Sequence, residues 1–365
     1  MCEKTDITMP SESKESSNKN ESPEPASFTA QYTCLGVLIG MFALWAKYAF
    51  VPEETSTPGV HVPMHDYHAT LYLTAGYLIS LPIIKYFVDT YTKNVDMKSL
   101  LFPSMVLYNV AQVAINGWMV YRFVKAVVSE GHPFIGSVSA TGTSYVVWVH
   151  YCDKYLEFLD TYFMVLRGKM NQVSFLHIYH HTSIAWAWWI GYTIMPGGDS
   201  YFGALLNSWI HVMMYSYYVL ALFKISCPWK KLLTQAQLLQ FLSVIVYSFF
   251  SLNSWSKEER TNSHLLASGI QVWEMSSLFF LFVVFYRKSY SSKKRKLDND
   301  VQPFSTKTTS ATNTNNIVAT AQKVATASLD AATEDVSKIV STAQRDPRVK
   351  NVVGATNIPS WSLVS

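Results

Sequence analysis

The sequence predicts an all-α membrane protein, and three observations support this prediction. Charged residues make up only 15% of the 365 residues, whereas about 25% is usual in a soluble protein. Aromatic residues are equally abundant, at 15%. The charges are also unevenly placed, because the segment 32–286 has few of them while both ends of the chain are polar. Such a pattern is typical of apolar helices in a bilayer, flanked by polar tails.

Composition also excludes several other classes of protein. The four cysteines form no CxxC pair, so neither a disulfide framework nor a zinc ribbon is indicated. The formal net charge is only +4, and no basic stripe with interleaved aromatic residues is present. Nucleic acid is therefore not an expected partner.

Four regions follow from the distribution of polar residues. Residues 1–30 are rich in Ser, Glu, Lys, Asn and Pro and are expected to form a disordered tail. Residues 31–52 are expected to form an additional spanning helix, and residues 69–290 a transmembrane domain. Residues 291–365 are basic at first and then of low complexity, so we expect a mostly disordered tail.

Eight apolar stretches are long enough to be membrane-spanning helices, which need about 20 residues each. They cover residues 32–51, 69–88, 104–128, 143–166, 173–191, 200–224, 232–252 and 265–287. Hydropathy is weakest for 143–166 and 173–191, because these two stretches contain several polar residues.

The distribution of basic residues tests this topology. If the basic segment 287–296 lies in the cytosol, alternating the eight stretches places most Lys and Arg residues of the loops on the same side. Only Arg122, Lys125, Lys257 and Arg260 fall on the opposite side. This asymmetry agrees with the positive-inside rule and predicts that both ends of the chain are cytosolic.

Ionisable residues inside these stretches form three helical faces, and such residues usually mark function in a membrane. Their spacings of three, four or seven residues place the members of each set on one side of a helix. The three sets are Lys154, Glu157 and Thr161; His177, His180 and His181; and Asn207, His211 and Tyr215. Lys154 and Glu157 are expected to pair, which lowers the cost of burying either charge.

The depth of these groups predicts a chamber. A rise of 1.5 Å per residue places Asp160 and His180 roughly 10 and 15 Å from the basic loop at 167–169. Asn109, Gln237 and Gln240 enter the bundle from the same side. We therefore expect a polar chamber that opens toward the cytosol, with an apolar far half.

Three histidines beside carboxylates allow two chemistries, metal binding and acyl transfer through an imidazole. A di-iron centre is disfavoured, because HxxHH occurs only once and di-iron desaturases need several such boxes. The set His61, His65 and His68 is expected on the opposite side, in a loop interrupted by Pro63. It is interpreted as a solvated loop, and weak metal binding there is left open.

Four ordered motifs resemble those of the ELO family of fatty-acid elongases. Residues 154–161, KYLEFLDT, are similar to KxxExxDT, and residues 177–181, HIYHH, to HxxHH. Residues 207–218, NSWIHVMMYSYY, are similar to NxxxHxxMYxYY, and Thr234, Gln237 and Gln240 to TxxQxxQ. Tyr108-Asn109 resembles the family's early YN pair. The resemblance covers about residues 69–290 and implies a seven-helix core, an inverted-barrel-like bundle around a tunnel.

The resemblance implies a reaction and a set of roles. A long-chain acyl-CoA and malonyl-CoA would condense to 3-oxoacyl-CoA, CO2 and CoA. His180 would be the nucleophile, and His211 with Asn207 or Gln237 would stabilise the enolate. His177 and His181 would orient groups or relay protons, while Glu157 and Asp160 would fix the imidazole tautomer. The resemblance thus implies a catalytic set of His180, His211, His177, His181, Glu157, Asp160 and Lys154, and a substrate-binding set of Asn109, Asn207, Tyr215, Gln237, Gln240 and Lys169.

Substrate, location and partners follow from the same resemblance. Gln172 and Tyr179 resemble the branch that elongates polyunsaturated chains. Elongation of saturated, monounsaturated or sphingolipid-type chains is the alternative, and a transporter is a more distant one.

The resemblance implies an endoplasmic reticulum membrane, no cofactor or metal, and partners that are membrane lipid and the reductases and dehydratase of the elongation cycle. A homodimer is left open. The sequence departs from the family in the extra stretch 32–51 and in lacking a terminal dilysine signal.

Overall fold

The computed structural model describes residues 25–50, 63–138, 141–255 and 260–300. Within these ranges the chain forms helices and no strand, which confirms the all-α prediction. The elements are α1 (Phe28–Ala49), the short 3-10 helix η2 (Pro63–His65), α2 (Tyr67–Tyr91), α3 (Met97–Ser129), α4 (Thr141–Leu156), α5 (Phe158–Leu166), α6 (Phe175–Ile194), α7 (Ser200–Leu222), α8 (Lys230–Ser254) and α9 (Asn262–Asp300).

Each of the eight predicted stretches is helical, but only five of them are long and apolar enough to cross a membrane by composition alone. These five are α1, α2, α3, α8 and α9. Of the remaining helices, α4 and α5 are shorter than a span, with 16 and 9 residues. Helices α6 and α7 are long enough, and the polar motifs that they hold lower their hydropathy. The chain is a multi-pass membrane protein in which the more polar helices need the others around them, because lipid cannot satisfy buried polar groups.

The stretch 143–166, predicted as one helix, is two helices that meet at Glu157. The Glu157 amide still donates to the Asp153 carbonyl at 3.0 Å, whereas the Asp160 amide donates to the Glu157 carbonyl, which is only three residues back. This local tightening to a 3-10 spacing ends α4 and starts α5. No Pro or Gly marks the break, so the sequence contained no signal for it.

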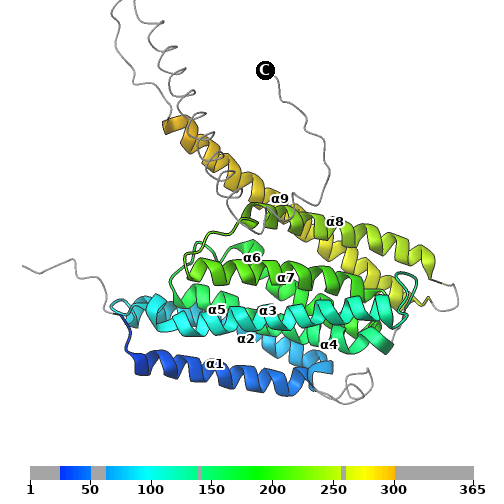
Figure 1. Ribbon diagram of the computed structural model, residues 1–365, viewed down its shortest axis with the longest axis horizontal. Helices are drawn as coiled ribbons and strands as arrows, with labels where there is room; N and C mark the ends of the chain where they lie inside the picture. The colour runs from blue at the N-terminus through cyan, green and yellow to red at the C-terminus, as the bar shows by residue number, and fades with distance from the viewer. Residues whose placement is uncertain (1–24, 51–62, 139–140, 256–259, 301–365) are drawn as a thin grey trace, which may run out of the picture. The chain divides into compact units, whose positions relative to one another are not determined.

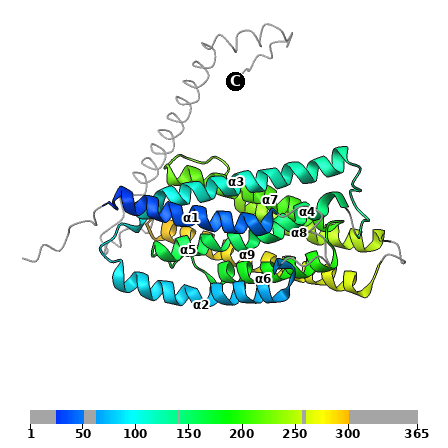
Figure 2. The same cartoon turned by 90° about the horizontal axis from the view of Figure 1, so that it is seen from below.

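The helices lie side by side with their axes roughly aligned (Figures 1 and 2). Figure 1 shows α1 at one edge of the bundle and α8 and α9 at the opposite edge. Figure 2 shows α2 and α3 at the other two edges, with α5 and α6 between them. Helix α3 packs along α7 and α1 packs along α3. Large buried side chains of α3, α4 and α7, among them Phe123, Trp148 and Tyr201, fill the centre.

Two indole groups fasten the additional helix α1 to α4. Trp45 Nε1 donates to the Cys152 carbonyl at 2.9 Å, and Trp148 Nε1 donates to the Ala49 carbonyl at 3.1 Å. The opposite side of α1 exposes apolar side chains such as Val37 and Leu44. Helix α1 thus has an outer face suited to lipid and an inner face bonded to the core.

The predicted tails fall largely outside the described residues. Residues 1–24 and 301–365 are not described, so their predicted disorder stays a prediction. The chain divides into two units, Met1–Lys296 and Leu297–Ser365. Helix α9 continues to Asp300, past the boundary expected at residue 290, because the Lys/Arg-rich segment is compatible with a helix.

At one end of the bundle, the buried carboxylate of Asp199 joins three parts of the chain. It accepts hydrogen bonds from the amides of Gly136 and Ser137, both at 3.0 Å. It also accepts from Trp255 Nε1 at 2.9 Å and from the hydroxyl of Ser251. The loop after α3, the start of α7 and the end of α8 therefore share one anchor.

We predict that Asp199→Ala destabilises the protein by about 3 kcal/mol, because it leaves several buried donors unpaired. Thermal unfolding of the purified protein in detergent measures the effect. Asp89→Ala is the control, since Asp89 forms an exposed pair with Lys85 on α2, and its effect should stay within about 0.5 kcal/mol. Equal shifts for the two variants would contradict the anchoring role.

Candidate active site

The centre of the site is a buried ion pair between Lys154 and Glu157. Lys154 Nζ lies 2.5 Å from Glu157 Oε1, and both side chains are 1% exposed. The same ammonium donates to Asn207 Oδ1 at 2.8 Å. Helix α4 and the α4–α5 break are thereby joined to α7 through charge-assisted hydrogen bonds, the strongest class of hydrogen bond in a protein.

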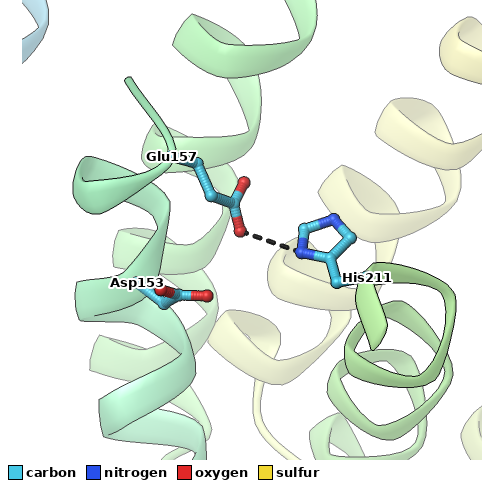
Figure 3. A group of neighbouring side chains, drawn as sticks. All are labelled: Asp153, Glu157 and His211. Atoms are coloured by element: carbon cyan, nitrogen blue, oxygen red, sulfur yellow. Dashed lines mark ion pairs between the residues drawn. The ribbon is translucent and has the colours of Figure 1, made fainter. Parts of the chain in front are cut away.

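His211 lies between Glu157 and Asn207. Its Nδ1 is 3.2 Å from Glu157 Oε1, and its Nε2 is 3.4 Å from Asn207 Nδ2. Because the amide nitrogen of Asn207 can only donate, Nε2 is the acceptor in a neutral ring and the proton lies on Nδ1. The break at Glu157 turns its carboxylate toward this ring (Figure 3).

The three histidines of α6 divide between two environments. Ser174 caps the helix by accepting from the His177 amide at 3.2 Å, which places the histidines in the first two turns. His177 Nε2 is 2.8 Å from the Thr161 hydroxyl, and the His177 and His181 ring centroids are 4.5 Å apart. His180 instead lines a cavity.

Asp160, expected beside an imidazole, contacts tyrosines instead. Its Oδ2 accepts from the Tyr215 hydroxyl at 2.7 Å, and the hydroxyls of Tyr215 and Tyr108 are 3.3 Å apart. Asp160 and Tyr215 therefore join α5 to α7 and α3 rather than fixing a histidine.

The cavity lies between α6, α7, α8 and α9 and has a volume of about 60 Å³. His180, Asn207 and Gln240 line one end, and Met195, Ser200 and Ala267 line the other. The helix rise gives roughly 22 Å between the levels of His180 and Met195 on α6. This is longer than one leaflet of a bilayer core, which is about 15 Å thick.

The wall of the cavity is not wholly apolar. Ile184, Val244 and Leu278 line it, as predicted for an apolar wall, but so do Gln271 and Glu274 of α9. Glu274 is buried and accepts from the Ser183 hydroxyl at 2.6 Å. Neither Gln271 nor Glu274 stands out in the sequence, because both are isolated polar residues within the apolar stretch 265–287.

Three predicted substrate-binding residues lie away from the central cluster. The Asn109 amide is buried and donates to the Met105 carbonyl of its own helix at 2.6 Å. Gln237 is partly buried on α8 but does not line the cavity, whereas Gln240, one turn later, does. Lys169 is exposed in the loop after α5.

The second histidine set does not form a metal box among the described residues. His65 is half-buried, with its ring centroid 4.6 Å from that of Trp148, so the expected solvated position is wrong for this residue. His68 is exposed and pairs with Asp66 at 2.7 Å. His61 lies outside the described residues.

A second buried polar group, which the sequence analysis missed, adjoins the ion pair. Asp153 is fully buried and accepts from Asn116 Nδ2 at 3.3 Å, and Asn116 also donates to Gln112 Oε1 at 2.9 Å. One helical turn before Asp153 on α4, His150 Nδ1 is 3.2 Å from the Ser208 hydroxyl. Asp153 lies one helical turn before Glu157, and that spacing was the available signal.

Asp153, Glu157 and His211 could hold a metal ion by distance, since one atom of each lies within 4.8 Å of the others. Figure 3 shows the three side chains, with Glu157 directed at His211. The Lys154 ammonium, however, already lies 2.5 Å from the Glu157 carboxylate. It supplies the positive charge that a metal would supply and repels a cation at the same place.

These features define a class of protein: a helical, multi-pass membrane protein with a buried Lys–Glu–His–Asn cluster at one end of a long cavity. The comparisons give the family. The model of the GNS1/SUR4 family, called ELO, matches residues 62–298. The chain belongs to this family.

Individual relatives agree with this assignment. The chain is 33% identical over 259 residues to "Very long chain fatty acid elongase 2" of Mus musculus, covering 68% of this chain and 84% of that protein. It is 34% identical to elongase 5 of Xenopus laevis, covering 63% and 78%. It is 35% identical to elongase 4 of Macaca mulatta, covering 52% and 63%.

We predict that Lys154→Met destabilises the protein by about 3–5 kcal/mol, because it leaves the Glu157 carboxylate buried without its partner. Adding Glu157→Gln to this variant removes the unpaired charge and should recover part of the loss. Thermal unfolding in detergent measures both. The control is Lys85→Met, which breaks an exposed Lys–Asp pair on α2 and should cost less than about 1 kcal/mol; a comparable loss there would contradict the prediction.

Proposed function

We propose that the protein is a condensing enzyme of fatty-acid elongation that joins a long-chain acyl-CoA to malonyl-CoA and releases 3-oxoacyl-CoA, CO2 and CoA. The observation that supports this most directly is the position of His180, which lines one end of a long, mostly apolar cavity. A nucleophile at the mouth of a channel suited to a fatty chain matches an acyl transfer. Membership of the ELO family supports the same reaction.

In the proposed mechanism, an imidazole nitrogen of His180 attacks the thioester carbonyl and displaces CoA, giving an acyl-imidazole. Decarboxylation of malonyl-CoA then produces an enolate, whose carbon takes the acyl group and returns His180. Because acyl transfer to His180 precedes the condensation with malonyl-CoA, this mechanism predicts ping-pong kinetics.

Asn207 is the best-placed group to stabilise the enolate oxygen. It lines the same end of the cavity as His180, and it has a second amide N–H besides the one directed at His211. Lys154 and His211 hold this amide from both sides. A donor fixed before the reaction begins needs no reorganisation when the charge develops.

Glu157 and the remaining histidines act on these groups rather than on substrate in this proposal. Glu157 Oε1 lies 3.2 Å from Nδ1 of His211 and pairs with Lys154, so its carboxylate would orient the ring as the acid of a catalytic triad orients its imidazole. His177 is fixed by Thr161, and His181 packs against His177, so both are suited to orient groups or relay protons. The reaction uses no metal or other cofactor in this scheme, and activity should be insensitive to chelators.

The substrates and location complete the proposal. Lys169 is exposed beside α5, at the end of the bundle where α6 begins, and it is suited to contact the phosphates of CoA. We place this mouth in the cytosol and the protein in the endoplasmic reticulum membrane, where it would work with the ketoacyl reductase, dehydratase and enoyl reductase of the cycle. Its preferred chains would be polyunsaturated, with saturated, monounsaturated or sphingolipid-type chains as the alternative.

Incubating the purified protein with acyl-CoA alone should release about one equivalent of free CoA per active site and leave an acyl-enzyme, because the first half-reaction needs no malonyl-CoA. Thiol titration and intact-protein mass spectrometry measure the two products. His180→Ala should show neither, while His68→Ala, on an exposed turn, should behave as the parent protein. No burst from the parent protein, or an unchanged burst from His180→Ala, would refute the covalent step.

Competition between acyl-CoAs tests the chain preference. Microsomes containing the protein receive labelled malonyl-CoA with a polyunsaturated and a saturated acyl-CoA of the same length. We expect the polyunsaturated product to dominate, because Gln172 and Tyr179 resemble the branch of the family that elongates polyunsaturated chains. Equal use of the two chains would overturn the preference and leave the condensing reaction intact.

A further inference from the structure

Two polar side chains of α9 interrupt the apolar wall of the cavity at successive depths. Glu274 and Gln271 are three residues apart and so lie on one face of α9, roughly 4.5 Å apart along its axis. Both line the cavity. Neither belongs to the Lys154–Glu157 cluster or has a role in the proposed reaction.

The depths of Glu274 and Gln271 along the cavity follow from the residues that lie beside them. Glu274 accepts from Ser183, which lies one turn beyond His180 on α6. Gln271 lies over Gly203, which is four residues from Asn207 on α7; a methyl group at Gly203 would come 3.2 Å from Gln271 Nε2. Glu274 is thus about one turn from the reacting end of the cavity, and Gln271 is somewhat farther.

Hydrogen bonds within the protein leave part of the bonding capacity of Glu274 and Gln271 unused. The Ser183 hydroxyl engages one carboxylate oxygen of Glu274, and a carboxyl group can accept on both oxygens. Among the described residues, the Gln271 amide has no hydrogen-bond partner. Leaving such groups unpaired beside a hydrocarbon chain is costly, and a site with buried hydrogen-bonding groups favours the ligand that pairs with them.

We propose that Glu274 and Gln271 recognise a hydroxyl group on the fatty chain, so that the cavity selects acyl chains that are hydroxylated in the half nearest the thioester. The proposal rests on the proposed function, because it assumes that the chain enters this cavity from His180. A hydroxyl at the level of Glu274 would donate to its carboxylate. One placed farther from the thioester would bond the Gln271 amide.

The competing explanation is that Glu274 only holds α9 against α6. The neighbouring pair Tyr179 and Ser277, with hydroxyls 2.9 Å apart, also joins these helices but does not line the cavity. Ser277→Ala is therefore a matched control: it removes a hydrogen bond between α6 and α9 and leaves the cavity wall unchanged. A purely structural role predicts that Ser277→Ala and Glu274→Leu behave alike.

The experiment measures kcat/KM for saturated acyl-CoAs of one length that are either plain or carry a single hydroxyl at successive carbons. Labelled malonyl-CoA reports turnover, and thermal shift reports binding of each acyl-CoA. The parent protein should prefer the hydroxylated chain at one position, and Glu274→Leu should lower that preference about tenfold. Gln271→Leu should lower it for a hydroxyl farther from the thioester and serves as the deciding variant if Glu274→Leu does not fold.

The outcomes separate this inference from the proposed function. A preference that survives both leucine variants, or that Ser277→Ala reduces equally, overturns the recognition role. If plain acyl-CoAs are not elongated at all, the proposed function fails, and the thermal shifts alone decide whether hydroxylated chains are favoured. A preference lost only in the cavity-facing variants supports the inference.

Discussion

The buried ion pair between Lys154 and Glu157 is the interaction on which the rest of the site depends. Two opposite charges that are each 1% exposed can persist inside a membrane bundle only if they are paired and hydrogen-bonded. Lys154 also donates to Asn207, and His211 Nδ1 lies 3.2 Å from Glu157 Oε1, so one electrostatic constraint joins α4 to α7. Glu157, which pairs with both Lys154 and His211, lies at the break between α4 and α5.

The distribution of polarity in the bundle follows from this constraint. Among the helices that hold the ion pair and the histidines, α4 and α5 are too short to be recognised as spans, and α6 and α7 do not reach the required hydropathy. The five apolar helices lie at the edges of the bundle. Asp199 at one end and the Asp160–Tyr215 contact near the other join helices that the apolar core would hold only loosely. Specific polar bonds are effective here because lipid offers no competing partner for them.

Much of the fold could be predicted from the sequence, because hydrophobic stretches and helical spacing are local properties. The eight helical stretches and the Lys154–Glu157 pair followed from length and from the i, i+3 rule. The break at Glu157, the turning of Asp160 toward Tyr215 and the burial of His65 did not, because each results from contacts between distant segments. Glu274 was overlooked because a single acid in an apolar stretch carries no spacing pattern.

The packing at the end of the cavity remote from His180 has a consequence for chain length. Met195, Trp255 and Ala267 form one apolar cluster there, and two of them also line the cavity. On the proposed function, each cycle lengthens the chain by two carbons at the thioester and drives its terminal methyl closer to this cluster. Growth would then stop by steric exclusion, so the side-chain volume at Met195 and Ala267, rather than any catalytic group, would set the longest product.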